Sequence, residues 1–157
     1  MSLKYRSTSA YLKPDPIYRS ILASKIINGI MLQGKKTISQ RIFYKACERL
    51  QKRIKGKEAI EIVETAINNV KPMVETKSRR VGGSNYQVPV PVSRRRQQAL
   101  AIRWVVDSAR GKKGKPMWEK LSDELYDAYN ATGSSYTKKE NIHKMAESNK
   151  AFAHLAW

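Results

Sequence analysis

The chain has 157 residues, with 31 lysines and arginines against 13 aspartates and glutamates, so its formal net charge is +18. This length suits one domain with a single core, and so large a charge favours a polyanionic partner, nucleic acid first. A single cysteine excludes an internal disulfide and a cysteine-based metal cluster, and no apolar run reaches the roughly 20 residues of a bilayer-spanning helix. We therefore expect no cofactor, no metal, no membrane and no small-molecule substrate.

Residues 1–14 form a basic stretch whose first acid follows only at Asp15. Its composition resembles an organellar transit peptide, but we favour an arm that becomes ordered on RNA. Residues 15–157 are expected to form one helical domain. Its first helix is predicted from about 17 to 32, with Asp15-Pro16 at its start and Gly34 after its end. Thr37 and Gly56 bracket a second helix, and a third runs from about 60 to 70.

A β-hairpin is predicted at about 73–92. Gly82-Gly83 can adopt the positive φ values of a tight turn, and apolar residues then alternate with polar residues and prolines from Tyr86 to Val92. Pro89 and Pro91 lack N–H groups on one strand edge, which therefore cannot pair with a further strand. The segment should accordingly be a free two-stranded arm.

Three more helices complete the predicted fold. Ser93 begins a fourth helix, Pro116 opens a fifth, and the last starts at about Lys138. The fold class is all-α: a six-helix bundle with one protruding β-hairpin between the third and fourth helices. The fifth helix carries several acids, so we expect it to face solvent or a basic protein neighbour, not RNA.

Clusters of cations indicate where RNA would bind. Basic residues flank the hairpin, recur every seventh position from Arg96 to Arg110, and occupy two glycine-containing loops. The two glycine-containing loops are not P-loops, because no buried strand precedes either of them. For any run of charged residues, the alternative to RNA binding is an ordinary helix or loop face exposed to solvent. The predicted RNA-binding residues are Lys35, Lys36, Arg79, Arg80, Arg94, Arg95, Arg96, Arg103, Arg110, Lys112, Lys113 and Lys115.

Other side chains carry weaker signals. Tyr86 could stack on a base or simply pack the arm to the body, and the other aromatic residues at helical spacing are mostly expected in the core. His143 and His154 are eleven apart, which does not suit a metal site. No pattern indicates catalysis. A DNA-binding or nucleoid protein and an RNA-modifying enzyme remain as alternatives; the first would need a base-reading helix, and the second a cofactor loop or an acid–base pair.

Several separated blocks resemble ribosomal protein number seven of the small subunit, in its bacterial and organellar form. They are Asp15-Pro16-Ile17-Tyr18, Gly34-Lys35-Lys36, Arg79–Gly83 with Tyr86–Val90, Ala99–Trp104, Lys138–Glu140, His143–Glu147 and Ala151–His154. The resemblance implies a helical bundle with a β-ribbon that binds small-subunit rRNA, nucleates the subunit head beside other head proteins, and lines the exit-site tRNA and outgoing mRNA. Residues facing tRNA and mRNA would be Arg79, Arg80, Gly82, Gly83, Lys138, Lys139, His143, Lys144 and Lys150.

The chain also departs from the family's bacterial pattern. Pro91 stands where an acid is usual, and Leu155-Ala156 where an aromatic residue and arginine are usual. Pro91 and the segments 94–98 and 117–122 favour a ribosome of the mitochondrial matrix, with bacterial cytoplasm and chloroplast stroma as alternatives.

Overall fold

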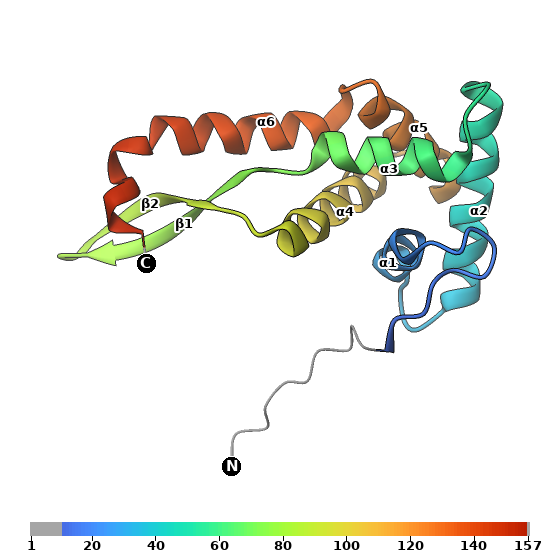
Figure 1. The fold of residues 1–157 in the computed structure, drawn as a ribbon, viewed down its shortest axis with the longest axis horizontal. Helices are drawn as coiled ribbons and strands as arrows, with labels where there is room; N and C mark the ends of the chain where they lie inside the picture. The colour runs from blue at the N-terminus through green and yellow to red at the C-terminus, as the bar shows by residue number, and fades with distance from the viewer. Residues whose placement is uncertain (1–10, 157) are drawn as a thin grey trace, which may run out of the picture.

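The computed structural model describes residues 11–156, in which helices surround a core and accompany one hairpin (Figure 1). The elements follow in the order α1(Ile21–Ile30), α2(Lys36–Arg53), α3(Ala59–Val70), β1(Val74–Val81), β2(Ser84–Pro91), α4(Arg94–Gly111), α5(Met117–Tyr129), α6(Gly133–Ser148) and the 3-10 helix η2(Lys150–Leu155). The predicted class, a six-helix all-α fold with one hairpin between the third and fourth helices, is confirmed. Most of the predicted basic arm, residues 1–10, lies outside the described residues.

Helix α5 is central to the helical body, because it packs against α2, α3, α4 and α6. Its apolar stripe of Leu121, Leu125 and Ala128 is fully buried. Burying a leucine side chain stabilises a fold by about 1.5–3 kcal/mol, so this stripe ties the surrounding helices together. Its acids lie beside this stripe, where Glu119, Asp123 and Asp127 stay partly exposed. That this acidic side meets a basic protein neighbour stays a prediction.

The first helix starts later than predicted, at Ile21. Asp15 caps a separate turn instead, since its Oδ2 accepts hydrogen bonds from the N–H groups of Ile17 and Tyr18, each at 3.1 Å. Arg19 has a φ of 49°, which no α-helix contains. Ser20 then caps α1 by accepting the N–H of Ala23. The predicted Asp15 cap is real, but it belongs to this turn.

The hairpin forms with the predicted turn. Val81 pairs with Ser84 across Gly82 and Gly83, whose φ values of 57° and 89° only glycine adopts without strain. Pro89 and Pro91 lie opposite Thr76 and Val74 in the register, alternating with hydrogen-bonded pairs that begin where Val92 N donates to Met73 O. The prolines thus interrupt no ladder hydrogen bond, as expected for an outer edge.

The ribbon projects from the helical body, but it is not free. Helix α6 runs alongside it and η2 turns back onto β2 (Figure 1). Val88 is fully buried, the ring of Tyr86 lies 5.1 Å from that of Phe152, and the Arg79 guanidinium donates to the Leu155 carbonyl. The prediction of a free arm is wrong because the apolar face of β2 needs cover, which the C-terminal segment provides. For Tyr86, packing is the interpretation that holds.

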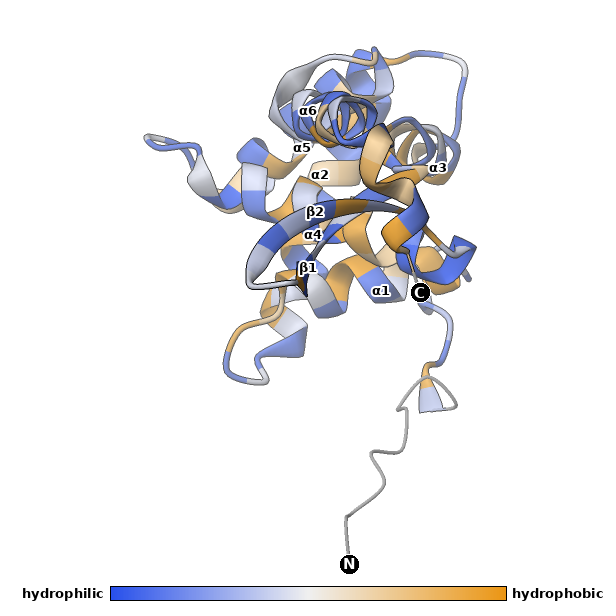
Figure 2. Ribbon diagram, turned by 90° about the vertical axis from the view of Figure 1, so that its left-hand side faces the viewer, coloured by the Kyte–Doolittle hydropathy of each residue, from blue (hydrophilic) through white to orange (hydrophobic). Residues whose placement is uncertain are grey.

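Hydropathy follows this arrangement. Hydrophobic residues of α1 and α4, such as Ile26 and Val105, are buried in the core, whereas Figure 2 colours α6 mostly hydrophilic. Among the described residues, no helix combines the length and apolarity that a bilayer crossing requires.

Candidate nucleic-acid interface

The ribbon and the start of α4 are joined by an ion pair. Arg96 Nε donates to both carboxylate oxygens of Glu75, at 2.8 and 2.9 Å, and Lys77 Nζ lies 3.5 Å from the same carboxylate. Arg80, near the turn, stays exposed. Arg96 thus fixes the ribbon on α4, while Arg80 remains available to an external anion.

The first turn of α4 contains three consecutive exposed arginines, Arg94, Arg95 and Arg96, and no acid. This is the wrong place for cations in terms of helix stability, because the N-terminal end of the helix dipole is positive and each cation there costs a few tenths of a kcal/mol. A sequence that violates a local preference in this way usually does so at a functional site. The cluster is therefore the strongest single indication of an anionic partner.

A groove of about 560 Å³ lies between α1 and α4. Ile102 and Val106 line it along with the cations Lys25, Arg103 and Arg110. Gly29 allows the two helices to approach, since a Cβ there would lie 3.4 Å from Ile102 Cγ2. Asp107 is the one carboxylate in the lining.

The three arginines at seven-residue spacing on α4 differ in what they contact. Arg110 Nη2 donates to the carbonyls of Gly29 and Ile30, both at 3.1 Å, and so satisfies the C-terminal end of α1. Arg96 pairs with the ribbon, as described above. Arg103 is exposed and lines the groove. The spacing does place all three on an exposed face. Arg96 and Arg110 bond to other parts of the chain, however, so Arg103 is the one of the three that we expect mainly to contact a partner.

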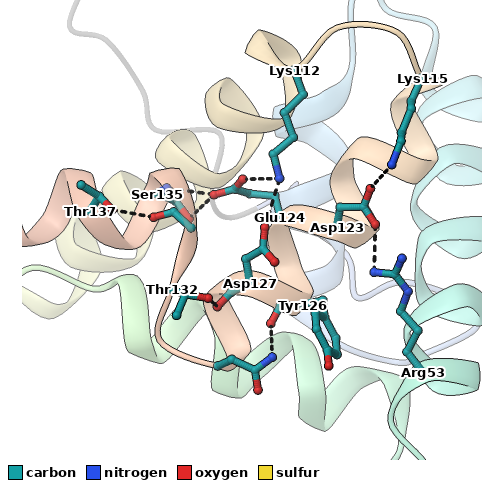
Figure 3. A network of polar contacts seen from close by, with 12 residues as sticks. Arg53, Lys112, Lys115, Asp123, Glu124, Tyr126, Asp127, Thr132, Ser135 and Thr137 are labelled. Carbon is teal, nitrogen blue, oxygen red and sulfur yellow. Dashed lines mark hydrogen bonds and ion pairs between the residues drawn. The ribbon is translucent and has the colours of Figure 1, made fainter.

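The loop between α4 and α5 is fastened by a buried carboxylate (Figure 3). Lys112 Nζ lies 2.8 Å from Glu124 Oε2, at an angle that makes an ion pair but not a well-aligned hydrogen bond, and 3.3 Å from Asp127 Oδ2. Burial lowers the pKa of Lys112, but the two carboxylates outweigh this effect and leave the pKa raised. Lys115 is 3.1 Å from Asp123, whereas Lys113 is exposed. Of the three predicted loop lysines, two are thus paired within the chain.

Glu124 also sets the start of α6. Its Oε1 accepts hydrogen bonds from Ser135 N at 2.8 Å and Ser135 Oγ at 2.7 Å (Figure 3). These bonds hold the first turn, so α6 begins at Gly133 and not near Lys138 as predicted. Composition suggested a loop there because glycine and serine favour turns.

The acids of α5 are matched by arginines of α2. Arg49 lies 3.0 Å from Glu119 and 3.3 Å from Asp123, and Arg53 lies 2.8 Å from Asp123. Partial burial would raise the pKa of Asp123, but Lys115 and the two arginines outweigh it and lower the pKa. This pairing was not predicted from the sequence. The signal was present, because Arg49 and Arg53, like Glu119 and Asp123, are four residues apart and share a helix face.

The residues of α6 and η2 that were predicted to face tRNA and mRNA also fall into two groups, exposed ones and ones that bond to other parts of the chain. Lys138, Lys144 and Lys150 are exposed. Lys139 Nζ donates to the Asn69 carbonyl at 3.0 Å, and His143 Nε2 accepts the Met73 N–H at 3.1 Å. The latter two residues therefore tie α6 to the end of α3 and the base of the ribbon.

Little in the described residues suggests chemistry beyond binding. No three His, Cys, Asp or Glu side chains among residues 11–156 gather as a metal site would require. Cys47 is fully buried, and burial raises the pKa of its thiol to about 12, so the thiolate form is scarce at neutral pH.

Comparison with known proteins identifies the family. The family model described as "Ribosomal protein S7p/S5e" matches residues 2–150. The chain is 53% identical over 152 residues to small ribosomal subunit protein uS7 of Rhodopirellula baltica, covering 96% of this chain and 97% of that one. For the proteins of the same name from Pelagibacter ubique and Petrotoga mobilis, the identities are 52% and 58%, with 100% and 92% of both chains covered. The chain therefore belongs to the S7p/S5e family of ribosomal proteins.

Proposed function

We propose that this chain is a structural constituent of the small ribosomal subunit that binds small-subunit rRNA directly and catalyses no reaction. Family membership supports this, and the observation that carries it on the molecule itself is the exposed arginine cluster that opens α4. RNA in folded junctions is recognised largely through its backbone and shape, which cations on a rigid helical body can match.

The proposed phosphate contacts are the predicted cations whose side chains are exposed and are not used within the chain by a contact described above. They come from the turn before α2, the tip of the ribbon, α4 and the following loop, and are Lys35, Lys36, Arg80, Arg94, Arg103 and Lys113. Arg95 is exposed as well but, like the remaining five predicted residues, interacts within the chain. Arg79, Arg96, Arg110, Lys112 and Lys115 would hold the interface in shape and touch RNA, if at all, with what hydrogen-bonding capacity is left.

We further propose that the ribbon and α6 face the exit-site tRNA and the outgoing mRNA, within a subunit head whose assembly this chain nucleates. The ribbon tip at Gly82-Gly83 and the exposed Lys144 and Lys150 support this assignment, since they belong to the ribbon, α6 and η2, and the ribbon and α6 extend side by side away from the rest of the molecule (Figure 1). Lys139 and His143 would position α6 against the end of α3 and the base of the ribbon. We expect other proteins of the subunit head as neighbours.

The comparisons change the compartment that we infer from the sequence. The relatives named above are bacterial and match at 52–58% identity, so they give no support to a mitochondrial ribosome. We propose the ribosome of a bacterial cytoplasm instead. The unusual residues at 91, 155 and 156 are then variation within the bacterial family.

The test is the salt dependence of binding to a small-subunit rRNA transcript. If about eight phosphates are contacted, log Kobs falls with log[salt] at a slope of roughly −6 to −7. Exchanging Arg94 and Arg103 for glutamine should make the slope less negative by about 1.4–1.8, because each phosphate contact contributes roughly 0.7–0.9. Exchanging Lys55 and Lys57, which are exposed outside this surface, removes the same charge and is the control.

Two outcomes would contradict the proposal. One is an R94Q/R103Q variant that binds rRNA with the affinity and slope of the unaltered chain. The other is equal or tighter binding to duplex DNA in direct competition, which would favour the alternative of a nucleoid protein.

A further inference from the structure

A second basic groove lies between α2 and α5, outside the surface proposed above. It has a volume of about 430 Å³ and is lined by Lys45, Glu48, Arg49, Lys52 and Trp118. Three cations thus face one carboxylate. None of these five residues is among the predicted RNA-binding residues, and the fifth helix, which contains Trp118, was expected not to face RNA because of its acids.

The pairing within the chain removes that objection. The carboxylates of Glu119 and Asp123 are already matched by Arg49, Arg53 and Lys115. With these pairs set aside, Lys45, Lys52 and Glu48 leave the groove with a net positive charge.

Lys45 and Lys52 supply this positive charge. Both side chains are exposed, and neither forms an ion pair with any residue between 11 and 156. Seven residues of helix separate them, a rise of roughly 10 Å, so the two ammonium groups can meet different phosphates.

Trp118 gives the groove an aromatic wall. Its side chain is partly exposed, and the guanidinium carbon of Arg49 lies 5.7 Å from the ring centroid. Arg49 is in turn held by Glu119, so the guanidinium beside the indole has a fixed partner. An aromatic ring flanked by cations is the combination on which unpaired bases stack while their backbone is neutralised.

We propose that this groove is a second rRNA contact, in which an unpaired base stacks on Trp118 and the flanking phosphates meet Lys45 and Lys52. It deepens the proposed function and rests on it. A protein partner fits less well, because the buried centres of protein interfaces are depleted in lysine, whereas lysines beside a tryptophan suit a nucleic acid.

The experiment combines residue-level footprinting with affinity measurements on the full chain and a small-subunit rRNA transcript. Hydroxyl-radical oxidation of Trp118, read by mass spectrometry, should fall at least about threefold when rRNA is added. Trp118→Ala should weaken binding by about five- to 150-fold, the equivalent of one lost base–aromatic stack, while Trp118→Phe should stay within a few-fold of the unaltered chain. Near-ultraviolet circular dichroism checks that each variant is folded.

A second part of the experiment tests the charges with the double variant Lys45→Gln/Lys52→Gln. This variant should make the slope of log Kobs against log[salt] less negative by about 1.4–1.8. The matched control, Lys55→Gln with Lys57→Gln, removes the same charge next to α2 but outside the groove and should change the slope by less than half as much. Footprinting of the unaltered chain keeps the test decisive even if a variant fails to fold.

Different failures have different meanings. If the unaltered chain does not bind rRNA, the proposed function itself fails. If it binds while Trp118 stays as reactive as before and the K45Q/K52Q slope equals that of the control, only this second contact is refuted. Protection of Trp118 that needs another ribosomal protein and does not occur with rRNA alone would assign the groove to a protein partner and likewise overturn the inference.

Discussion

The buried carboxylate of Glu124 should couple strongly to Lys112. Glu124 is fully buried in α5, whereas the Lys112 side chain, in the loop before it, is 31% exposed. Because the carboxylate also accepts two hydrogen bonds from Ser135, it connects the loop, α5 and the first turn of α6. A double-mutant cycle with Glu124→Gln and Lys112→Met isolates the pair, since both changes nearly conserve volume.

The size of the coupling follows from the distance and the exposure. Two unit charges 2.8 Å apart attract by about 6 kcal/mol at an effective dielectric constant of 20. Desolvation of the carboxylate and the water that reaches Lys112 cancel much of this, so the net coupling should be about 2 kcal/mol, within the range for a hydrogen bond to a charged group. Lys112→Met alone should cost about 3 kcal/mol, because it leaves a buried charge without its cation.

Urea unfolding followed by circular dichroism gives the four free energies of the cycle, with unchanged m values as the check on two-state behaviour. Lys113→Met is the matched control: this lysine is exposed in the same loop, and its loss should change stability by less than about 0.5 kcal/mol. A coupling energy below about 0.5 kcal/mol between Glu124 and Lys112 would refute the reasoning.

Three further predictions concern titration, reactivity and backbone strain. The pKa of Asp123 is lowered on folding, so its contribution to stability is present above its unfolded pKa of about 4 and is lost as the pH falls below that; Asp123→Asn should flatten the acid limb of a stability–pH profile, and an unchanged limb would contradict this. Cys47 should resist alkylation by iodoacetamide at pH 8 until the protein is unfolded by urea, so rapid labelling of folded protein would show the burial to be wrong. Gly133→Ala should destabilise by more than about 2 kcal/mol, because φ is 89° and the new Cβ would lie 2.7 Å from Asp127 Cβ, whereas Gly111→Ala, with open space and an ordinary φ, should be neutral or slightly stabilising in the same urea assay.

Much of the fold could be predicted because local signals agreed with one another. Apolar spacing identified the helices, and Gly82-Gly83 with alternating valines identified the hairpin and its turn. The errors arose where a signal was local but its partner was distant. Asp15 does cap a turn, but no feature of the neighbouring sequence shows that Arg19 adopts a positive φ and so separates this turn from α1. Ser135 lies in a stretch that reads as a loop, and only Glu124, eleven residues earlier, makes it helical.

The candidate interface was predictable in outline but not in its details. Composition and clustering pointed to cations of the ribbon, α4 and two loops, and most of these side chains are exposed. They could not show which cations the chain uses itself, because that depends on contacts between residues far apart in sequence, such as Arg110 with the end of α1 or Arg96 with the ribbon. The free arm failed for the same reason, since the segment that covers β2 lies more than sixty residues later.

These internal contacts change how a net charge of +18 should be understood. The net charge counts every lysine and arginine alike. However, Arg49 and Lys112 form ion pairs with carboxylates of α5, and Arg96 forms one with Glu75 of the ribbon. Such cations make the body rigid and hold the exposed ones at fixed separations. Recognition of a folded RNA backbone depends on those separations, because flexible charges would attract phosphates without selecting their arrangement. On the proposed function, the charge alone would give affinity for RNA, whereas selectivity for one rRNA junction would also depend on the cations that hold the exposed ones in place.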